Sequence, residues 1–149
     1  MLNTFCINMI MYIFVPIKVT AMKTHTFDAQ YSDGNTKVSF SVGVYMFKED
    51  DTFISYCPAL DLSGYGMTET EARNSFAQTI GMYIEYCLHK NTLVKDLQKH
   101  GWNIKSMKQK KIKAPDINQM MENNPDFKEI IESKEYTEYL EQVKIPAFA

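Results

Sequence analysis

Hydrophobic and polar residues alternate over the first half of the chain in a pattern that predicts antiparallel strands. Every second position from 38 to 46 is apolar: Val38, Phe40, Val42, Val44 and Met46. This period of two is typical of a strand with one buried face. Weaker alternation predicts further strands over residues 23–31, 52–57 and 62–67, and the Ser-Asp-Gly-Asn-Thr segment at 32–36 has the composition of a turn. We therefore expect a meander of antiparallel strands.

Beyond residue 67 the period of the pattern becomes helical. Apolar residues recur four positions apart: Ala72, Phe76, Ile80, Ile84 and Leu88. This spacing predicts a helix of about 20 residues with one face on the sheet. Thr68 and Glu71 have the spacing of a capping box and mark its start. A second, short helix is expected through Leu93, Leu97 and Lys99, capped by Asn91 and ended by Gly101, and a strand over 102–105 is expected after it.

The C-terminal third has a different character. Five lysines fall between residues 105 and 113, and eight acidic residues against two lysines give residues 116–141 a net charge of −6. Pro125 suits the first turn of a helix, and apolar residues return at 143–149. We expect an appended helix followed by a terminal strand or hook that docks on a partner or on a second copy of the chain.

Together these elements predict an α+β fold, in which one long helix packs on an antiparallel sheet of three to four strands, with a C-terminal helical appendage. A chain of 149 residues fits one such domain with additions at its ends. We expect the α+β domain to cover residues 23–106. Residues 107–149 would then form the linker, the acidic helix and the terminal strand.

The N-terminal stretch is apolar from Phe5 to Ile17. This run is shorter than the roughly 20 residues that span a bilayer, and no basic residue precedes it as in a secretory signal. We expect residues 1–22 to be an extension or a mis-called start, with Met22 as the natural first residue. An extra strand packed on the core and a poor signal or anchor are the alternatives.

Composition narrows the class of protein further. A net charge of −2 with 45% hydrophobic and 23% charged residues is an ordinary globular balance and does not by itself favour nucleic acid. Cys6, Cys57 and Cys87 are an odd number without a CxxC pair, which indicates buried thiols in a reducing compartment. We therefore expect a cytoplasmic protein with no membrane partner.

Candidate chemistry is sparse. A metal-dependent nuclease needs converging carboxylates, and the strand-region candidates are Asp28, Asp50, Asp51 and Asp61. Turn positions favour solvent-facing acids there instead. Cys87 lies on the apolar stripe, and His89, two positions further, points elsewhere. We expect no catalytic residue, no metal site and no cofactor.

Two other features have simple structural explanations. The lysine run at 105–113 could hold RNA phosphate or an acidic partner, although a solvated linker is the simpler interpretation. Gly64 and Gly66 could cradle an anion, but backbone bending between strands is the simpler role.

The stretch from residue 57 to residue 72 resembles a known family. Its motifs are a Cys-Pro-x-Leu turn and a Gly-x-Thr-x-x-Glu-Ala step that leads into the long helix, and they are formed by Cys57, Pro58, Leu60, Gly66, Thr68, Glu71 and Ala72. These motifs resemble those of the HicB antitoxins, which connect a three-stranded sheet to its helix in this way. The resemblance covers residues 38–102. It implies a small ribonuclease-H-like domain without nuclease activity. Such a domain binds and inhibits a HicA-type toxin, which is a small RNA-cleaving protein.

Many members of that family carry an operator-binding domain after this core. Residues 103–149 show no helix-turn-helix pattern, and the acidic segment 116–141 opposes DNA binding. We expect an antitoxin-like protein, not an enzyme, that captures a small basic toxin, with the acidic segment countering the charge of the toxin.

Exposed apolar and aromatic groups beside a proline are typical of a contact surface. We therefore expect the partner to bind at Tyr56, Pro58, Leu60 and Tyr65. The alternative is an orphan module that self-associates into a homo-oligomer through its strands and the 143–149 end, without a toxin.

Overall fold

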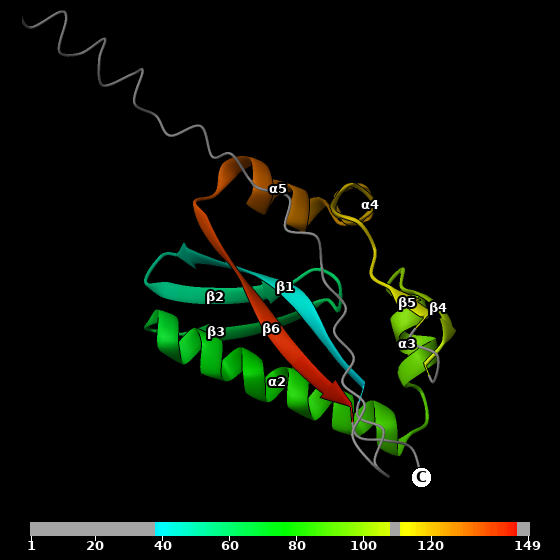
Figure 1. Ribbon diagram of the computed structural model, residues 1–149. Coiled ribbons are helices and arrows are strands. Elements are labelled where there is room, and N and C mark those ends of the chain that lie inside the picture. Colours follow the sequence, from blue (N-terminus) through cyan, green and yellow to red (C-terminus); the bar gives the residue numbers. More distant parts are fainter. Residues whose placement is uncertain (1–37, 108–110, 146–149) are drawn as a thin grey trace, which may run out of the picture.

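A computed structural model describes residues 38–107 and 111–145 of the chain (Figure 1). Its strands are β1 (Val38–Glu49), β2 (Thr52–Cys57), β3 (Leu62–Gly66), β4 (Asn103–Ser106), β5 (Lys111–Lys113) and β6 (Tyr136–Ile145). Its helices are α2 (Glu69–His89), α3 (Leu93–Lys99), α4 (Ile117–Asn123) and α5 (Pro125–Ser133). The expected α+β class with a four-stranded antiparallel sheet is confirmed for this part of the chain. The expectations for residues 1–22 and for a strand over 23–31 lie outside the described residues.

The main sheet has the order β3-β2-β1-β6, with α2 along one face (Figure 1). The β1 strand is buried from Val42 to Phe47 without a break, although the alternating pattern predicts only one buried face. The second face is covered because Tyr45 packs edge-on against Phe127 of α5, with their ring centroids 4.9 Å apart. The sheet is therefore sandwiched between α2 and α5 along its central strand.

The C-terminal strand is part of this sheet. Antiparallel pairing of β1 with β6 runs from Val38 opposite Ile145 to Phe47 opposite Tyr136, and Val143 and Ile145 are buried. The expectation that the terminal strand docks on a partner or on a second copy is thus corrected, because it docks on its own chain. The main sheet also draws its strands from both sides of the boundary expected at residue 106.

A small two-stranded ribbon follows α3. The glycine that ends α3, Gly101, has a φ of +89°, and Asn91, expected to cap α3, instead adopts a φ of +57° one residue before the cap Thr92. The indole of Trp102 then donates a hydrogen bond of 2.7 Å to the carbonyl of Ala59. This bond fixes the start of β4 to the turn between β2 and β3.

The β4–β5 ribbon includes part of the segment expected to be a linker. Its inner residues Ile104 and Ile112 are paired with each other and join the hydrophobic core. Its outer face carries Asn103 opposite Lys113.

No helix in the described part of the chain is both long and apolar enough to cross a bilayer.

Candidate functional site

The step from β3 into α2 is built by the motif residues. Thr68 Oγ1 accepts a hydrogen bond of 3.2 Å from the Glu71 amide, and Glu71 Oε2 accepts one of 3.3 Å from the Thr68 amide. This reciprocal pair confirms the capping box. Directly behind it, Ala72 is completely buried, so α2 begins in contact with the sheet.

The two glycines of β3 allow this contact. A Cβ atom at Gly64 would lie 2.3 Å from the Phe76 nitrogen, and one at Gly66 would lie 2.4 Å from the Glu71 Cβ. Pairing of β3 with β2 is in register along the whole strand, so these glycines introduce no β-bulge. The glycines are needed because the helix backbone approaches the strand closely.

The outer edge of β3 is covered by the same helix. The Tyr65 amide donates to Ser75 Oγ at 3.1 Å, and the Met67 amide donates to Glu71 Oε2 at 2.7 Å. A sheet edge invites another strand only where its backbone groups are free. These two amides are therefore closed to strand addition.

The residues expected to meet a partner are mostly inside the molecule. Tyr56 and Leu60 are only 9% and 1% exposed, and Pro58 is buried beside them. Of the four, Tyr65 alone is exposed, at 58%. The expected exposure of the turn is thus wrong for Tyr56, Pro58 and Leu60.

The thiol of Cys57 lies inside the molecule next to this turn. Burial raises its pKa to about 12, so it stays protonated at neutral pH and behaves as a small hydrophobic group. The burial expected of this thiol is confirmed.

A polar cleft of about 470 Å³ lies beside the same turn. Its walls are the β2–β3 turn with Asp61, the end of α3 with Lys99 and His100, and the α4–α5 junction with Asn124 and Asp126. Carboxylates, carboxamides and an ammonium group therefore surround one opening. Such a lining suits the charged and hydrogen-bonding groups of a polar ligand or of a protein side chain.

Tyr56 holds two walls of this cleft together. Its hydroxyl donates to Asp61 Oδ1 at 2.9 Å and accepts from Asn124 Nδ2 at 2.5 Å. Asn124 in turn caps α5, because its Oδ1 accepts from the Phe127 amide at 3.0 Å. Burial, reinforced by the Asp61 carboxylate, raises the pKa of the Tyr56 hydroxyl. Tyr56 is therefore a positioning residue under the cleft.

Asp61 has a φ of +53°. Aspartate tolerates this left-handed conformation better than most residues do. The carboxylate is thus placed at the mouth of the cleft by the turn itself, as well as by its bond to Tyr56.

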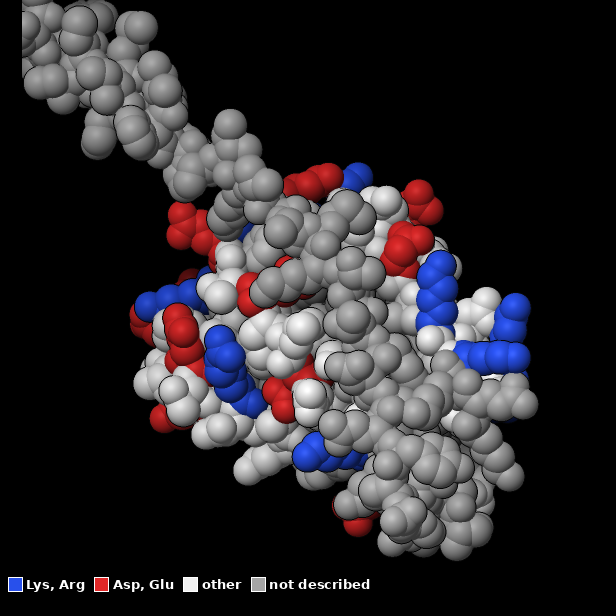
Figure 2. Space-filling view, in the orientation of Figure 1, with Lys and Arg blue, Asp and Glu red and all other residues white. Residues whose placement is uncertain are grey.

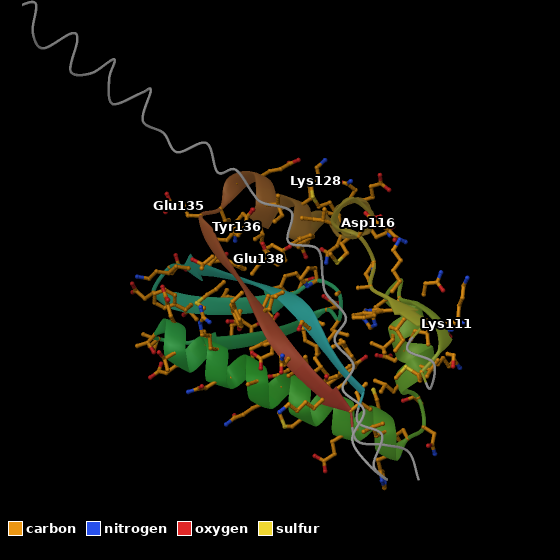
Figure 3. The ribbon with its side chains drawn as sticks, in the orientation of Figure 1. Lys111, Asp116, Lys128, Glu135, Tyr136 and Glu138 are labelled. Atoms are coloured by element: carbon orange, nitrogen blue, oxygen red, sulfur yellow. The ribbon has the colours of Figure 1, made fainter. Side chains whose placement is uncertain are left out.

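Charge is unevenly distributed over the surface. On the face shown in Figure 2, acidic side chains gather over α4 and α5, and lysines gather over β4 and β5. Figure 3 shows the two ends of this division, with Glu135 and Glu138 at the start of β6 and Lys111 on the far ribbon. The acidic surface, as we name it, consists of the exposed residues Asp116, Glu122, Asp126, Glu129, Glu132 and Glu135.

The carboxylates, thiols and imidazoles of the described residues are scattered. Within residues 38–107 and 111–145, no three His, Cys, Asp or Glu side chains converge on a point that could hold a metal ion. Asp50, Asp51 and Asp61 lie in turns, as expected, and Asp28 lies outside the described residues. Cys87 is buried on the core face of α2, and His89 is exposed at its end.

Comparison of the chain with protein-family models, with curated proteins and with solved structures finds no match in any of the three. The function must therefore be inferred from the residues themselves. The sequence pattern did not reveal the cleft, because its walls come from three distant segments. The one local signal was Asn124 followed by Pro125, a pair typical of a helix start.

Proposed function

We propose that the protein is a HicB-like antitoxin, a binding protein and not an enzyme, which captures a small basic RNA-cleaving partner of the HicA type. The observation that supports this proposal is the Gly66–Ala72 step. Every motif residue there has a structural role. Gly66 leaves room for the close approach of the helix backbone, and Thr68 and Glu71 cap the helix. Ala72 is buried in its first turn. The HicB antitoxins use the same step to connect sheet and helix.

The surface that we assign to the partner is the acidic surface together with the cleft. Asp126 belongs to both, and Asp61 lines the cleft with it. Lysine and arginine side chains of a basic partner would form charge-assisted hydrogen bonds with these carboxylates. The charge of the whole surface would orient the partner during encounter. Neutralisation would then follow from burial of the partner's active face.

The alternative is an orphan module that self-associates without a toxin. The segregation of charge favours it, because the acidic surface of one copy is complementary to the lysines of another. The covered edge of β3 disfavours pairing of copies through that strand. Self-association would therefore be sensitive to salt.

The first experiment is native purification from the host with mass spectrometry of the associated proteins. We expect one small basic protein in stoichiometric amount, whose RNA cleavage is inhibited by the purified chain. Recovery of the chain alone as a homo-oligomer would support the orphan module instead. A partner without ribonuclease activity would reject the toxin assignment.

The binding surface is tested with the double variant Asp61→Asn, Asp126→Asn. Asparagine keeps the positive φ of Asp61 and can still accept from Tyr56, so only the charge is lost. We expect the dissociation constant for the partner to rise at least about tenfold. The matched control is Asp50→Asn, Asp51→Asn in the β1–β2 turn, which changes the net charge equally. Deletion of residues 115–149 is unsuitable as a test, because it removes β6 from the sheet.

A further inference from the structure

The side of the molecule that carries α3 and the β4–β5 ribbon has many lysines that acidic residues do not balance. Between residues 90 and 113 the described part of the chain has six lysines and a single acidic residue, Asp96. That carboxylate is already engaged, because it accepts a hydrogen bond from the Tyr83 hydroxyl and lies 3.7 Å from His100 Nδ1. The salt bridges of the described residues include none of these six lysines.

The lysines of the ribbon share its outer face. Ile112 is in the core, so Lys111 and Lys113 on either side of it lie on the outer face, and Lys105, at the register shift between Ile104 and Ser106, is exposed as well. Alternate residues on one strand are about 7 Å apart, so the side chains of Lys111 and Lys113 start close together on β5. Like charges at this separation repel each other. An anionic ligand would remove this repulsion.

The geometry points to nucleic acid as that ligand. We propose that the outer face of the β4–β5 ribbon, with Lys95 and Lys99 of α3 nearby, binds the phosphate backbone of nucleic acid without reading its bases. A lysine is a mobile point charge with three donors and suits phosphate contacts, whereas base recognition more often uses planar arginine or amide groups. A two-stranded ribbon also fits the major groove of a duplex.

The ribbon lacks the groups that would stack on bases. Trp102, at its start, is buried and bonded to the Ala59 carbonyl, so it is not available to a base. Binding should therefore be insensitive to sequence and strongly dependent on salt, as backbone contacts are. The acidic surface is on a different part of the molecule (Figure 2), so the proposed protein partner and a nucleic acid would share only Lys99, which also lines the cleft.

The test measures binding of the full chain to three fluorescent probes: a single-stranded RNA, a single-stranded DNA and a duplex DNA, each of about 20 nucleotides or base pairs. Fluorescence anisotropy is recorded at several salt concentrations between about 50 and 200 mM. The triple variant Lys105→Gln, Lys111→Gln, Lys113→Gln should bind at least about tenfold more weakly at the lowest salt. The slope of the logarithm of its binding constant against the logarithm of the salt concentration should be smaller in magnitude by about 2 to 3. Each lost phosphate contact lowers this slope by about one.

The matched control is Lys48→Gln, Lys128→Gln, Lys144→Gln, which removes three exposed lysines elsewhere. It should bind as the natural chain does, and thermal unfolding verifies that both triple variants fold. A preference among the three probes would identify the nucleic acid. No binding to any probe at the lowest salt, or equal losses in both variants, would overturn the proposal. Equally tight binding of polyglutamate through the same lysines would assign the surface to an acidic protein instead.

This test is independent of the proposed function, since it contains only the chain and a nucleic acid. A failure to find a toxin would leave it unaffected. Self-association through the ribbon is a further rival. Concentration-dependent oligomers that disappear in the ribbon variant, without nucleic-acid binding, would show that the acidic surface of a second copy is the ligand.

Discussion

Gly64 lies directly under the backbone of Phe76: a methyl group added at Gly64 would be 2.3 Å from the Phe76 nitrogen and 2.6 Å from its Cα. Backbone atoms of a helix cannot move aside as a flexible side chain can. Gly64→Ala should therefore push α2 away from β3 and lower the free energy of unfolding by about 3 kcal/mol, at the upper end of the cost of overpacking. Urea denaturation followed by circular dichroism measures this change.

Gly81 provides the matched control in the same helix. An added Cβ there meets nothing within 4 Å, and alanine is favoured over glycine inside a helix by about 0.5–1 kcal/mol. Gly81→Ala should thus raise the free energy of unfolding by that amount. Equal effects of the two substitutions would contradict the close approach at Gly64.

The cap of α2 predicts a smaller effect. Thr68→Ala removes the acceptor for the Glu71 amide and should lower the free energy of unfolding by about 1 kcal/mol. Thr68→Ser keeps the hydroxyl oxygen and should stay close to the natural protein. A loss in the serine variant as large as in the alanine variant would mean that the methyl group, and not the hydrogen bond, matters.

Removal of the Tyr56 hydroxyl tests the link under the cleft. Tyr56→Phe keeps the ring beside Phe127 but leaves Asp61 and Asn124 without the group that connects them. We expect a loss of about 1–2 kcal/mol in the free energy of unfolding, as for partly buried polar groups that lose a partner. Tyr65→Phe, at an exposed position, should change it by less than about 0.5 kcal/mol. Hydrogen exchange at the α5 amides should increase only in the Tyr56 variant.

Alkaline pH should destabilise the protein through Cys57. Burial raises the pKa of this thiol from its ordinary value of 9.0 to about 12. Between these values the unfolded chain releases a proton that the folded chain retains, so stability is full below pH 9 and falls as pH rises towards 12. The slope contributed by this group is about 1.4 kcal/mol per pH unit.

Urea unfolding at about pH 8, 9 and 10 measures this slope. Cys57→Ala should be less stable at every pH, because it leaves a small cavity. The free energy of unfolding of this variant should nevertheless fall less steeply above about pH 9, because one titrating group is missing. Parallel curves for the two proteins would contradict the assignment of the slope to Cys57. Burial also raises the pKa of Tyr45 and Tyr56, so both proteins should lose further stability above about pH 10.

The elements that could be predicted from the sequence are those with local signals. Alternation identified β1 and β2, helical spacing with a capping box identified α2, and Gly101 marked the end of α3. In each case the residues that define the element are within a few positions of one another. Pro125 in the first turn of α5 belongs to the same group.

The rest depends on contacts between distant residues. The β6 strand has an irregular burial pattern and carries Glu138 and Glu141, and its place in the sheet is decided by pairing with β1, at the other end of the domain. The glycines of β3 looked like bends because the helix that crosses them is not visible in their neighbourhood. Tyr56 and Leu60 looked exposed for a similar reason, since α5 and Trp102 cover the turn only in the folded chain.

The pairing of β1 with β6 also affects how the protein is made. The central strand leaves the ribosome early, and its neighbour follows only about 100 residues later, so the chain depends on a contact of high sequence separation. Until residues 136–145 emerge from the exit tunnel, β1 carries an open edge and a bare aromatic face, which are the features that chaperones and aggregating chains recognise. Folding of the sheet thus waits for residues 136–145, and a chain that lacks them would leave β1 unpaired on one edge and open to degradation.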